Sequence, residues 1–162
     1  MENRIGQKKP RTVTIGVYLD DSLADVVEEA TYAASAARDG GASDGVLAEA
    51  VAAIGEAQQR LDDATQWFTF TSMGRVAFNA LSAEHPATDA DTARDPDAQW
   101  DAETFPPALI AASLTDPVMT VDEVTALFAD PAWNDAELAA LVAAALAVNT
   151  QARQVTVRGV QP

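Results

Sequence analysis

The chain contains no cysteine, one histidine and only two lysines, and each shortage narrows what the protein can do. Without cysteine it can form no disulfide bond, thiolate nucleophile or cysteine-ligated zinc site. Neither Lys8 nor Lys9 follows a glycine-rich loop, so we do not expect a phosphate-binding loop. No apolar run approaches the roughly 20 residues of a membrane span, and the first residues are too polar for a signal peptide. We therefore expect a protein made and used in a cytoplasm, without cofactor or metal.

Basic residues are scarce overall, and the net charge of −15 is unevenly distributed. Residues 1–11 contain four basic and one acidic side chain, a net charge of +3, whereas the rest contains six basic and 24 acidic ones, a net charge of −18. A body this acidic repels nucleic acid and anionic membranes, so we expect neither as a partner. Residues 1–11 are typical of a basic flexible arm.

Hydrophobic residues make up 48% of the chain, but 35 of the 162 residues are alanine. Alanine favours helix and buries little area, so close-packed helices with a thin core are expected. We expect residues 12–149 to form a single acidic domain that leaves room for a partner to add stability.

Side-chain types alternate between two faces over residues 12–19 and 66–71, and this alternation predicts two strands. Between them, acidic residues early in each segment, a late arginine and the pair Gly40-Gly41 predict an αα-hairpin, with its second helix over about 44–63. The strands would then pair antiparallel. After them, Ser72 can cap a helix from Met73 to about Glu84.

Residues 86–104 are rich in aspartate and lack an apolar period, so they predict an exposed, mobile loop. Beyond it, Pro106-Pro107 and two capping-box spacings predict a cluster of three short helices. In the last of these, one apolar face holds Leu138, Leu141, Val142, Ala145 and Val148. Residues 150–162 form a tail that alternates weakly and could add an edge strand. The predicted fold class is α+β, predominantly helical.

No group of residues predicts catalysis. His85 stands beside a proline at a helix end, where histidine usually caps the helix. The aspartates of the 86–104 loop do not fit a calcium loop, because Arg94 and Trp100 stand where a glycine and a glutamate are needed. Weak binding of divalent ions remains an alternative to a solvated loop. An enzyme is the least expected class.

The segment 67–70 carries aromatic residues on both strand faces, Trp67 on one and Phe68 and Phe70 on the other. Such residues are most often core. An exposed face would instead provide an apolar surface for a protein partner.

The segment 65–149 resembles a tail assembly chaperone of long-tailed actinobacterial phages. The most specific parts of this resemblance are ETFPPALIAAS, residues 103–113, and AALAVN, residues 144–149. Further matching residues are Phe68, Phe70, Met73, Gly74, Arg75, Phe78, Leu81, His85, Pro86, Met119, Glu123 and Trp133.

The resemblance implies a non-enzymatic protein that binds the long, aggregation-prone tape measure protein and helps tail tube subunits assemble around it. It implies a place in the host cytoplasm during assembly and absence from the finished virion. The family commonly has a short and a frameshifted longer form. The tail tube protein is a second expected partner, and self-association is a third.

Our hypothesis at this stage is that the aromatic strand and the FPPALI helix form the partner-binding surface. Its residues would be Phe68, Phe70, Arg75, Phe105, Pro106, Leu109 and Ile110. Two other classes stay open. One is a phage or prophage structural subunit, such as a small head–tail connector. The other is an acidic DNA mimic, which would need carboxylates along one long face.

Overall fold

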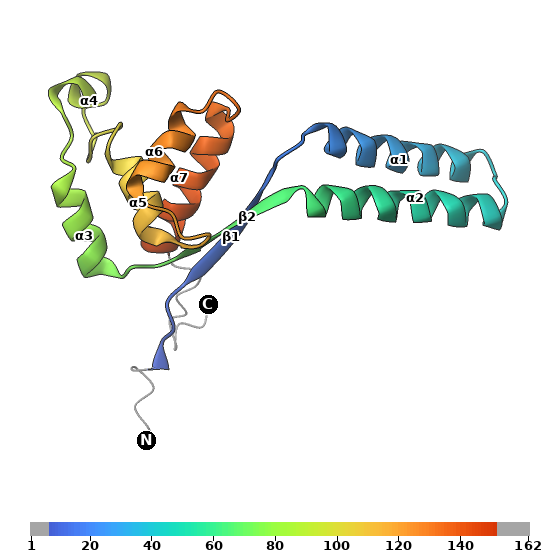
Figure 1. Cartoon of the computed structure of the whole chain (residues 1–162), viewed down its shortest axis with the longest axis horizontal. Coiled ribbons are helices and arrows are strands. Elements are labelled where there is room, and N and C mark those ends of the chain that lie inside the picture. Colours follow the sequence, from blue (N-terminus) through green and yellow to red (C-terminus); the bar gives the residue numbers. More distant parts are fainter. Residues whose placement is uncertain (1–6, 152–162) are drawn as a thin grey trace, which may run out of the picture. The chain divides into compact units, whose positions relative to one another are not determined.

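The computed structural model describes residues 7–151, and the predicted edge strand in the tail lies outside that range. The described residues form seven helices and three strands, which confirms the α+β, mainly helical fold class. Figure 1 shows their order along the chain. The elements are β1 (Thr12–Tyr18), α1 (Ser22–Asp39), α2 (Asp44–Asp63), β2 (Thr65–Thr71), α3 (Arg75–Glu84), α4 (Asp89–Arg94), α5 (Phe105–Ser113), β3 (Leu114–Asp116), α6 (Val121–Ala129) and α7 (Asp135–Thr150).

The predicted pairing of two antiparallel strands is part of a three-stranded sheet in the order β1-β2-β3. β3 pairs antiparallel with β2, with Phe70 opposite Leu114 and Thr69 opposite Asp116. β2 is therefore the central strand of the sheet. β3 was not predicted, because its three residues are too few to show an alternating pattern.

The chain divides into two compact units. Residues 16–67 form one unit, and the flanking residues on either side, 7–15 and 68–151, form the other. Both boundaries fall inside strands, in β1 and in β2. Neither boundary is marked by a glycine- or proline-rich linker, so the sequence predicts a single domain over 12–149.

The smaller unit consists mainly of the hairpin of α1 and α2, as predicted. Its less exposed residues recur at alternating spacings of three and four on both helices, the pattern of an antiparallel coiled coil. The residues that follow this pattern are Leu23, Val27, Ala30, Ala34 and Ala37 on α1, and Leu47, Ala50, Ile54, Ala57 and Leu61 on α2. Half of these are alanine, and α1 has no fully buried residue. The hairpin interface is therefore thin.

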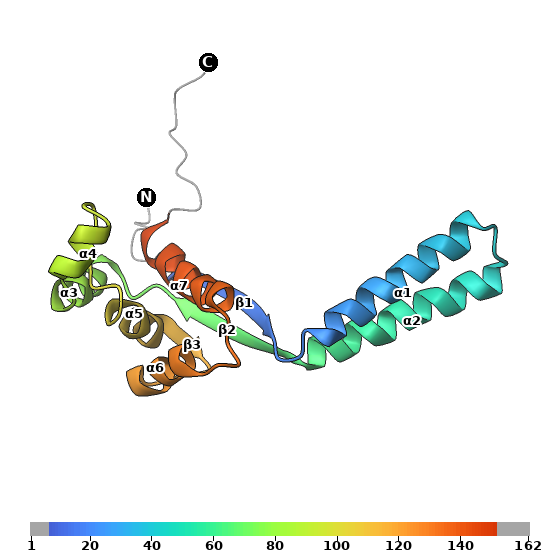
Figure 2. The same ribbon diagram turned by 90° about the horizontal axis from the view of Figure 1, so that it is seen from above.

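The larger unit has the main core, with α5 at its centre in contact with α3, α6 and α7. Figure 2 shows these helices gathered beside the strands. The side chains of Phe70, Phe105, Leu109, Ile110 and Leu141 are almost fully buried. The FPPALI helix is thus the central core helix of this unit.

A buried polar contact joins the two sequence segments that carry the resemblance. The side-chain amide of Asn149, near the end of α7, donates to the hydroxyl of Ser113 at the end of α5, at 2.9 Å. Ser113 is fully buried, and Asn149 also accepts a hydrogen bond from the amide of Met73, at 3.0 Å. Hydrogen bonding satisfies these polar groups inside the core and fixes the spacing of α5 and α7.

Arg11 is part of the larger unit, not of a free arm. Its guanidinium donates to the carbonyl of Ala147, at 2.8 Å, and to the carbonyl of Gln151. A cation at the C-terminal end of α7 is favourable because of the helix dipole. The predicted flexible arm is therefore wrong at Arg11.

The predicted irregular loop over 86–104 is wrong at α4. Thr88 and Asp91 form a capping box that starts this helix. Further along, the indole of Trp100 stacks on the ring of Phe105, with centroids 4.6 Å apart. The aspartates of this segment are part of its order, because the side chains of Asp91, Asp95 and Asp101 accept hydrogen bonds from backbone amides.

α3 begins two residues later than predicted. Gly74, with φ of +84°, precedes the helix, and the amide of Gly74 donates to the hydroxyl of Ser72. A positive φ favours glycine at this turn. Ser72 therefore stabilises the turn before the helix and does not cap it, whereas the predicted end of the helix at Glu84 is confirmed.

Candidate functional site

Five of the seven predicted partner-binding residues are in the core, and this corrects the hypothesis. Phe68, Phe70, Phe105, Leu109 and Ile110 are at most 3% exposed. The ring of Phe105 lies among other rings, which explains its burial. Aromatic residues at these positions form the core, so they cannot present the exposed surface that the hypothesis required.

The other two predicted residues are accessible. Arg75 is exposed in the first turn of α3. Pro106 is half-buried in the first turn of α5, where its missing N–H is not needed. Pro106 also borders an apolar groove, and this groove is the best candidate site in the described part of the chain.

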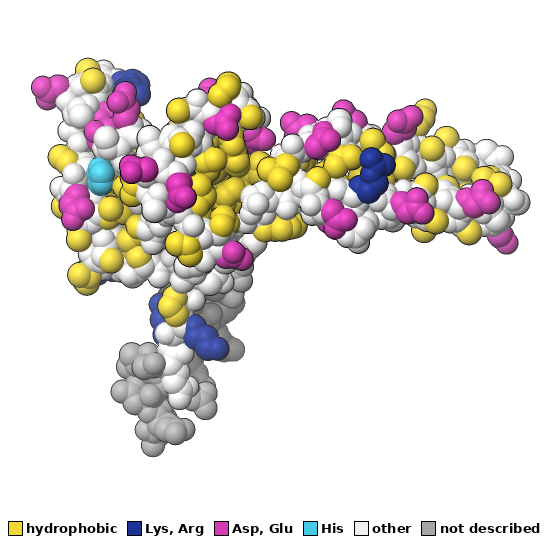
Figure 3. Space-filling view, in the orientation of Figure 1, with side chains coloured by type: hydrophobic (Ala, Val, Ile, Leu, Met, Phe, Trp, Pro, Cys, Tyr) yellow, Lys and Arg dark blue, Asp and Glu magenta, His cyan; other side chains and the backbone are white. Residues whose placement is uncertain are grey.

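The groove lies between the start of α5, the end of α6 and one side of α7, with a volume of about 470 Å³. Figure 3 shows hydrophobic side chains gathered over this part of the molecule. We call this site the α7 groove. Its lining residues are Pro106, Phe128, Asp135, Leu138, Ala139, Val142, Ala143 and Leu146. Seven of these eight are apolar.

α7 supplies most of the groove because it is apolar on nearly all sides. Leu141 and Val148 face the core, whereas Leu138, Val142 and Leu146 form a half-buried row with a spacing of four residues. Residues four apart lie on one helix face. A helix that is apolar all round is normally covered all round. In the described part of the chain, this row is covered on one side only.

The predicted apolar face of α7 is only partly buried in the core. Leu141, Ala145 and Val148 are buried, whereas Leu138 and Val142 at its edge line the groove. The sequence already indicated a second apolar surface on this helix. The run LAALVAAALAV has too many apolar residues for one face, which indicates a second surface to cover.

Two capping boxes fix the helices that border the groove, as their sequence spacings predicted. The side chain of Asn134 accepts from the amides of Ala136 and Glu137 at the start of α7. At the start of α6, Glu123 accepts from the amide of Thr120, at 2.8 Å, and this bond lowers the pKa of Glu123. The caps hold both helix starts in place before any partner arrives.

All charged residues in the sequence around the groove are acidic. Residues 105–151 contain six acidic side chains and no lysine, arginine or histidine. One of the six, Asp135, lines the groove itself, and Asp130 follows α6 directly. The groove therefore combines an apolar floor with an acidic segment.

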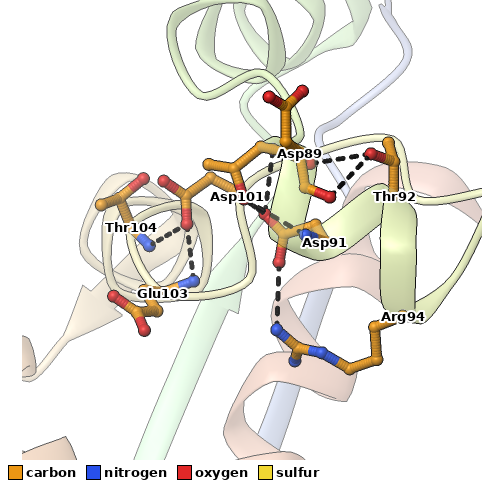
Figure 4. Close-up of polar contacts among 8 residues, drawn as sticks. Asp89, Asp91, Thr92, Arg94, Asp101, Glu103 and Thr104 are labelled. Atoms are coloured by element: carbon orange, nitrogen blue, oxygen red, sulfur yellow. Dashed lines mark hydrogen bonds and ion pairs between the residues drawn. The ribbon is translucent and has the colours of Figure 1, made fainter.

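A second hollow of similar size, about 460 Å³, lies beside α4. Its lining includes Asp91, Arg94 and Trp100, and Figure 4 shows how the polar groups lie. The hydroxyl of Thr88 donates to Asp91, at 2.6 Å, and this bond lowers the pKa of Asp91. Arg94, whose own side chain is exposed, approaches the same buried carboxylate at 3.5 Å, a long contact that contributes little. These groups stabilise the fold of the segment.

The remaining sequence candidates also have structural partners. Asp101 accepts hydrogen bonds from the amides of Glu103 and Thr104, and the bond from Glu103 lowers the pKa of Asp101. His85 is the C-cap residue of α3, and its Nδ1 lies 2.9 Å from the hydroxyl of Thr104. Between residues 7 and 151, no group of three or more acidic or histidine side chains could hold a metal ion. No helix in that range is long and apolar enough to span a membrane.

Compared with protein-family models, curated proteins and solved structures, the chain has no significant match in any of the three. The function must therefore be argued from the groove, the charge and the sequence resemblance.

Proposed function

We propose that this protein is a non-catalytic tail assembly chaperone of a long-tailed phage, and that it binds the tape measure protein through the α7 groove. The observation that carries the proposal is the uncovered apolar row of Leu138, Val142 and Leu146. A chaperone that keeps an aggregation-prone client soluble needs accessible apolar surface and high net charge. The groove and the charge of −15 supply both.

The position of the groove adds support. Two of its eight lining residues come from the segments on which the resemblance is most specific, Pro106 from ETFPPALIAAS and Leu146 from AALAVN. The proposal keeps Pro106 from the original surface and replaces the five buried residues with the α7 row. It places the protein in the host cytoplasm during assembly and outside the finished virion.

The proposal can be tested by co-expressing the chain with the tape measure protein of the same genome. That protein should be encoded beside it by a very long gene, after a frameshift overlap. We expect the tape measure protein to be soluble and to co-purify with the chain, and to aggregate without it.

A matched pair of variants on α7 separates groove binding from general effects. Ala139 and Ala140 are both exposed, but only Ala139 lines the groove. We expect Ala139→Lys to abolish co-purification and Ala140→Lys to leave it intact. Failure of the unmodified chain to bind or solubilise the tape measure protein would refute the proposed function. Detection of the chain in purified virions by mass spectrometry would favour a structural subunit.

A further inference from the structure

We infer that the α7 groove takes a basic amphipathic α-helix of another protein, seated with its apolar face on the Leu138, Val142 and Leu146 row. This inference deepens the proposed function, on which it rests, because it names the chemistry of the partner segment at the same site. It depends on three observations: the shape of the row, the state of the backbone around it, and the sign of the surrounding charge.

The shape of the row fits about two turns of helix. From Leu138 to Leu146 the row spans eight residues, which corresponds to about 12 Å along α7. Phe128 of α6 and Pro106 of α5 border it. A partner helix with apolar residues at spacings of three and four would place two or three of them along this length.

The backbone around the row disfavours an extended partner. A strand binds by pairing its N–H and C=O groups with a free sheet edge. Leu138 to Leu146 are interior positions of α7, where backbone groups are hydrogen-bonded within the helix. An extended segment lying on the row would leave its own polar backbone groups unpaired. A helix satisfies its backbone internally, so it can bury an apolar face here.

The charge decides between a second copy of this chain and a different protein. The segment from α5 to α7 contains six acidic and no basic side chains, and Asp135 lies in the groove lining. Two copies meeting at this face would bring their Asp135 carboxylates together, and each chain has a net charge of −15. Like charges at an interface oppose association, whereas lysine or arginine beside an apolar stripe would complement the acidic rim. The partner helix is therefore basic.

The experiment measures binding of synthetic helical peptides to the full chain by fluorescence anisotropy. Three peptides of about five turns share one leucine face and differ only in the residues that flank it. One has lysine, one glutamine and one glutamate at those positions. We expect the lysine peptide to bind at least about tenfold more tightly than the glutamate peptide, with the glutamine peptide between them. Raising the salt concentration should reduce this preference.

The same two variants locate the binding. Ala139→Lys should weaken binding of the lysine peptide at least about tenfold, since it adds bulk and positive charge in the groove. Ala140→Lys changes the net charge equally and should have less than about a threefold effect. Because both alanines are exposed, neither variant should disturb folding, and circular dichroism checks this.

Three results would overturn the inference: equal affinity for the lysine and glutamate peptides, equal losses in both variants, or a dimer that Ala139→Lys alone dissociates. The last would identify a second copy as the occupant. These outcomes are distinct from failure of the proposed function. Peptide binding as expected without tape measure binding would leave the inference standing, whereas tape measure binding that is insensitive to Ala139→Lys would refute it.

Discussion

The hairpin of α1 and α2 and the helices α5 to α7 are both helical, alanine-rich and acidic, yet they bury apolar residues very differently. In the hairpin, only Ala57 and Leu61 are buried, and exposed residues such as Tyr32 and Val51 are scattered over its surface. In α5 to α7, large side chains fill a core, and the surplus apolar residues gather into one groove. Exposed apolar residues alone are common on protein surfaces. Their collection into one lined hollow is what indicates a partner.

The largest predicted effect is the difference in stability cost between a substitution in the core and one in the hairpin. Leu109→Ala removes a fully buried side chain from the centre of the core and should cost about 2–5 kcal/mol. Val51→Ala in the hairpin, at a position that is 61% exposed, should change stability by less than about 0.5 kcal/mol. Chemical denaturation measures both. Equal costs would mean that the two regions do not differ in packing as described.

Because the core side chains of β2 and α5 are buried, charged substitutions of them cannot be used to test partner binding. Phe70→Asp or Leu109→Asp would place an unpaired charge in the core, where neither residue is exposed at all. Such variants should fail to fold, so loss of a partner would not report on a binding surface. The groove variants of α7 avoid this problem.

A smaller predicted effect concerns the sparse packing of the hairpin. Gly55 lies inside α2, and a Cβ added there meets no atom within 4 Å. Gly55→Ala should therefore stabilise the protein by roughly 1 kcal/mol through helix propensity. Gly74→Ala should destabilise it instead, because the φ of Gly74 is +84°. Thermal unfolding of the two variants checks the opposite signs. Destabilisation by Gly55→Ala would imply an additional packing contact at that face of α2.

The smallest predicted effect depends on pH and concerns the larger unit. Hydrogen bonds from Thr88 lower the pKa of Asp91, so the ionised carboxylate stabilises the folded state. That contribution is complete above the ordinary carboxyl pKa and is lost as pH falls through the lowered value. Asp91→Asn should therefore lower the melting temperature at pH 7. The difference from the unmodified chain should shrink as pH falls below the ordinary carboxyl pKa and through the lowered pKa of Asp91. A difference independent of pH would contradict this role.

Much of the fold could be predicted from the sequence, since alternation and helix punctuation are local signals. They placed both long strands and the helical hairpin, and capping residues such as Thr120 and Asn134 marked helix starts. α4 and β3 could not be predicted in this way. α4 is a short polar helix that depends on its capping box, and β3 exists because it pairs with β2.

The candidate site was harder to predict than the fold. In the sequence, Phe68 and Phe70 favour the core but leave an exposed surface open, and only tertiary packing decides between the two. Ala139 gives no signal in the sequence, because alanine in a helix is ordinary, and Val142 was predicted only as part of an apolar helix face. The groove arises where three helices meet, so no single segment contains it. Pro106 is the one residue of the original surface that also lines the groove.

The most direct test of the groove is a nuclear magnetic resonance titration of the full chain with the lysine-rich helical peptide, observed at methyl groups. We predict that the methyl signals of Leu138, Val142 and Leu146 shift in a saturable way, while those of Val26 and Val51 in the hairpin stay unchanged. Shifts confined to the hairpin valines, or no saturable shift on α7, would contradict the account.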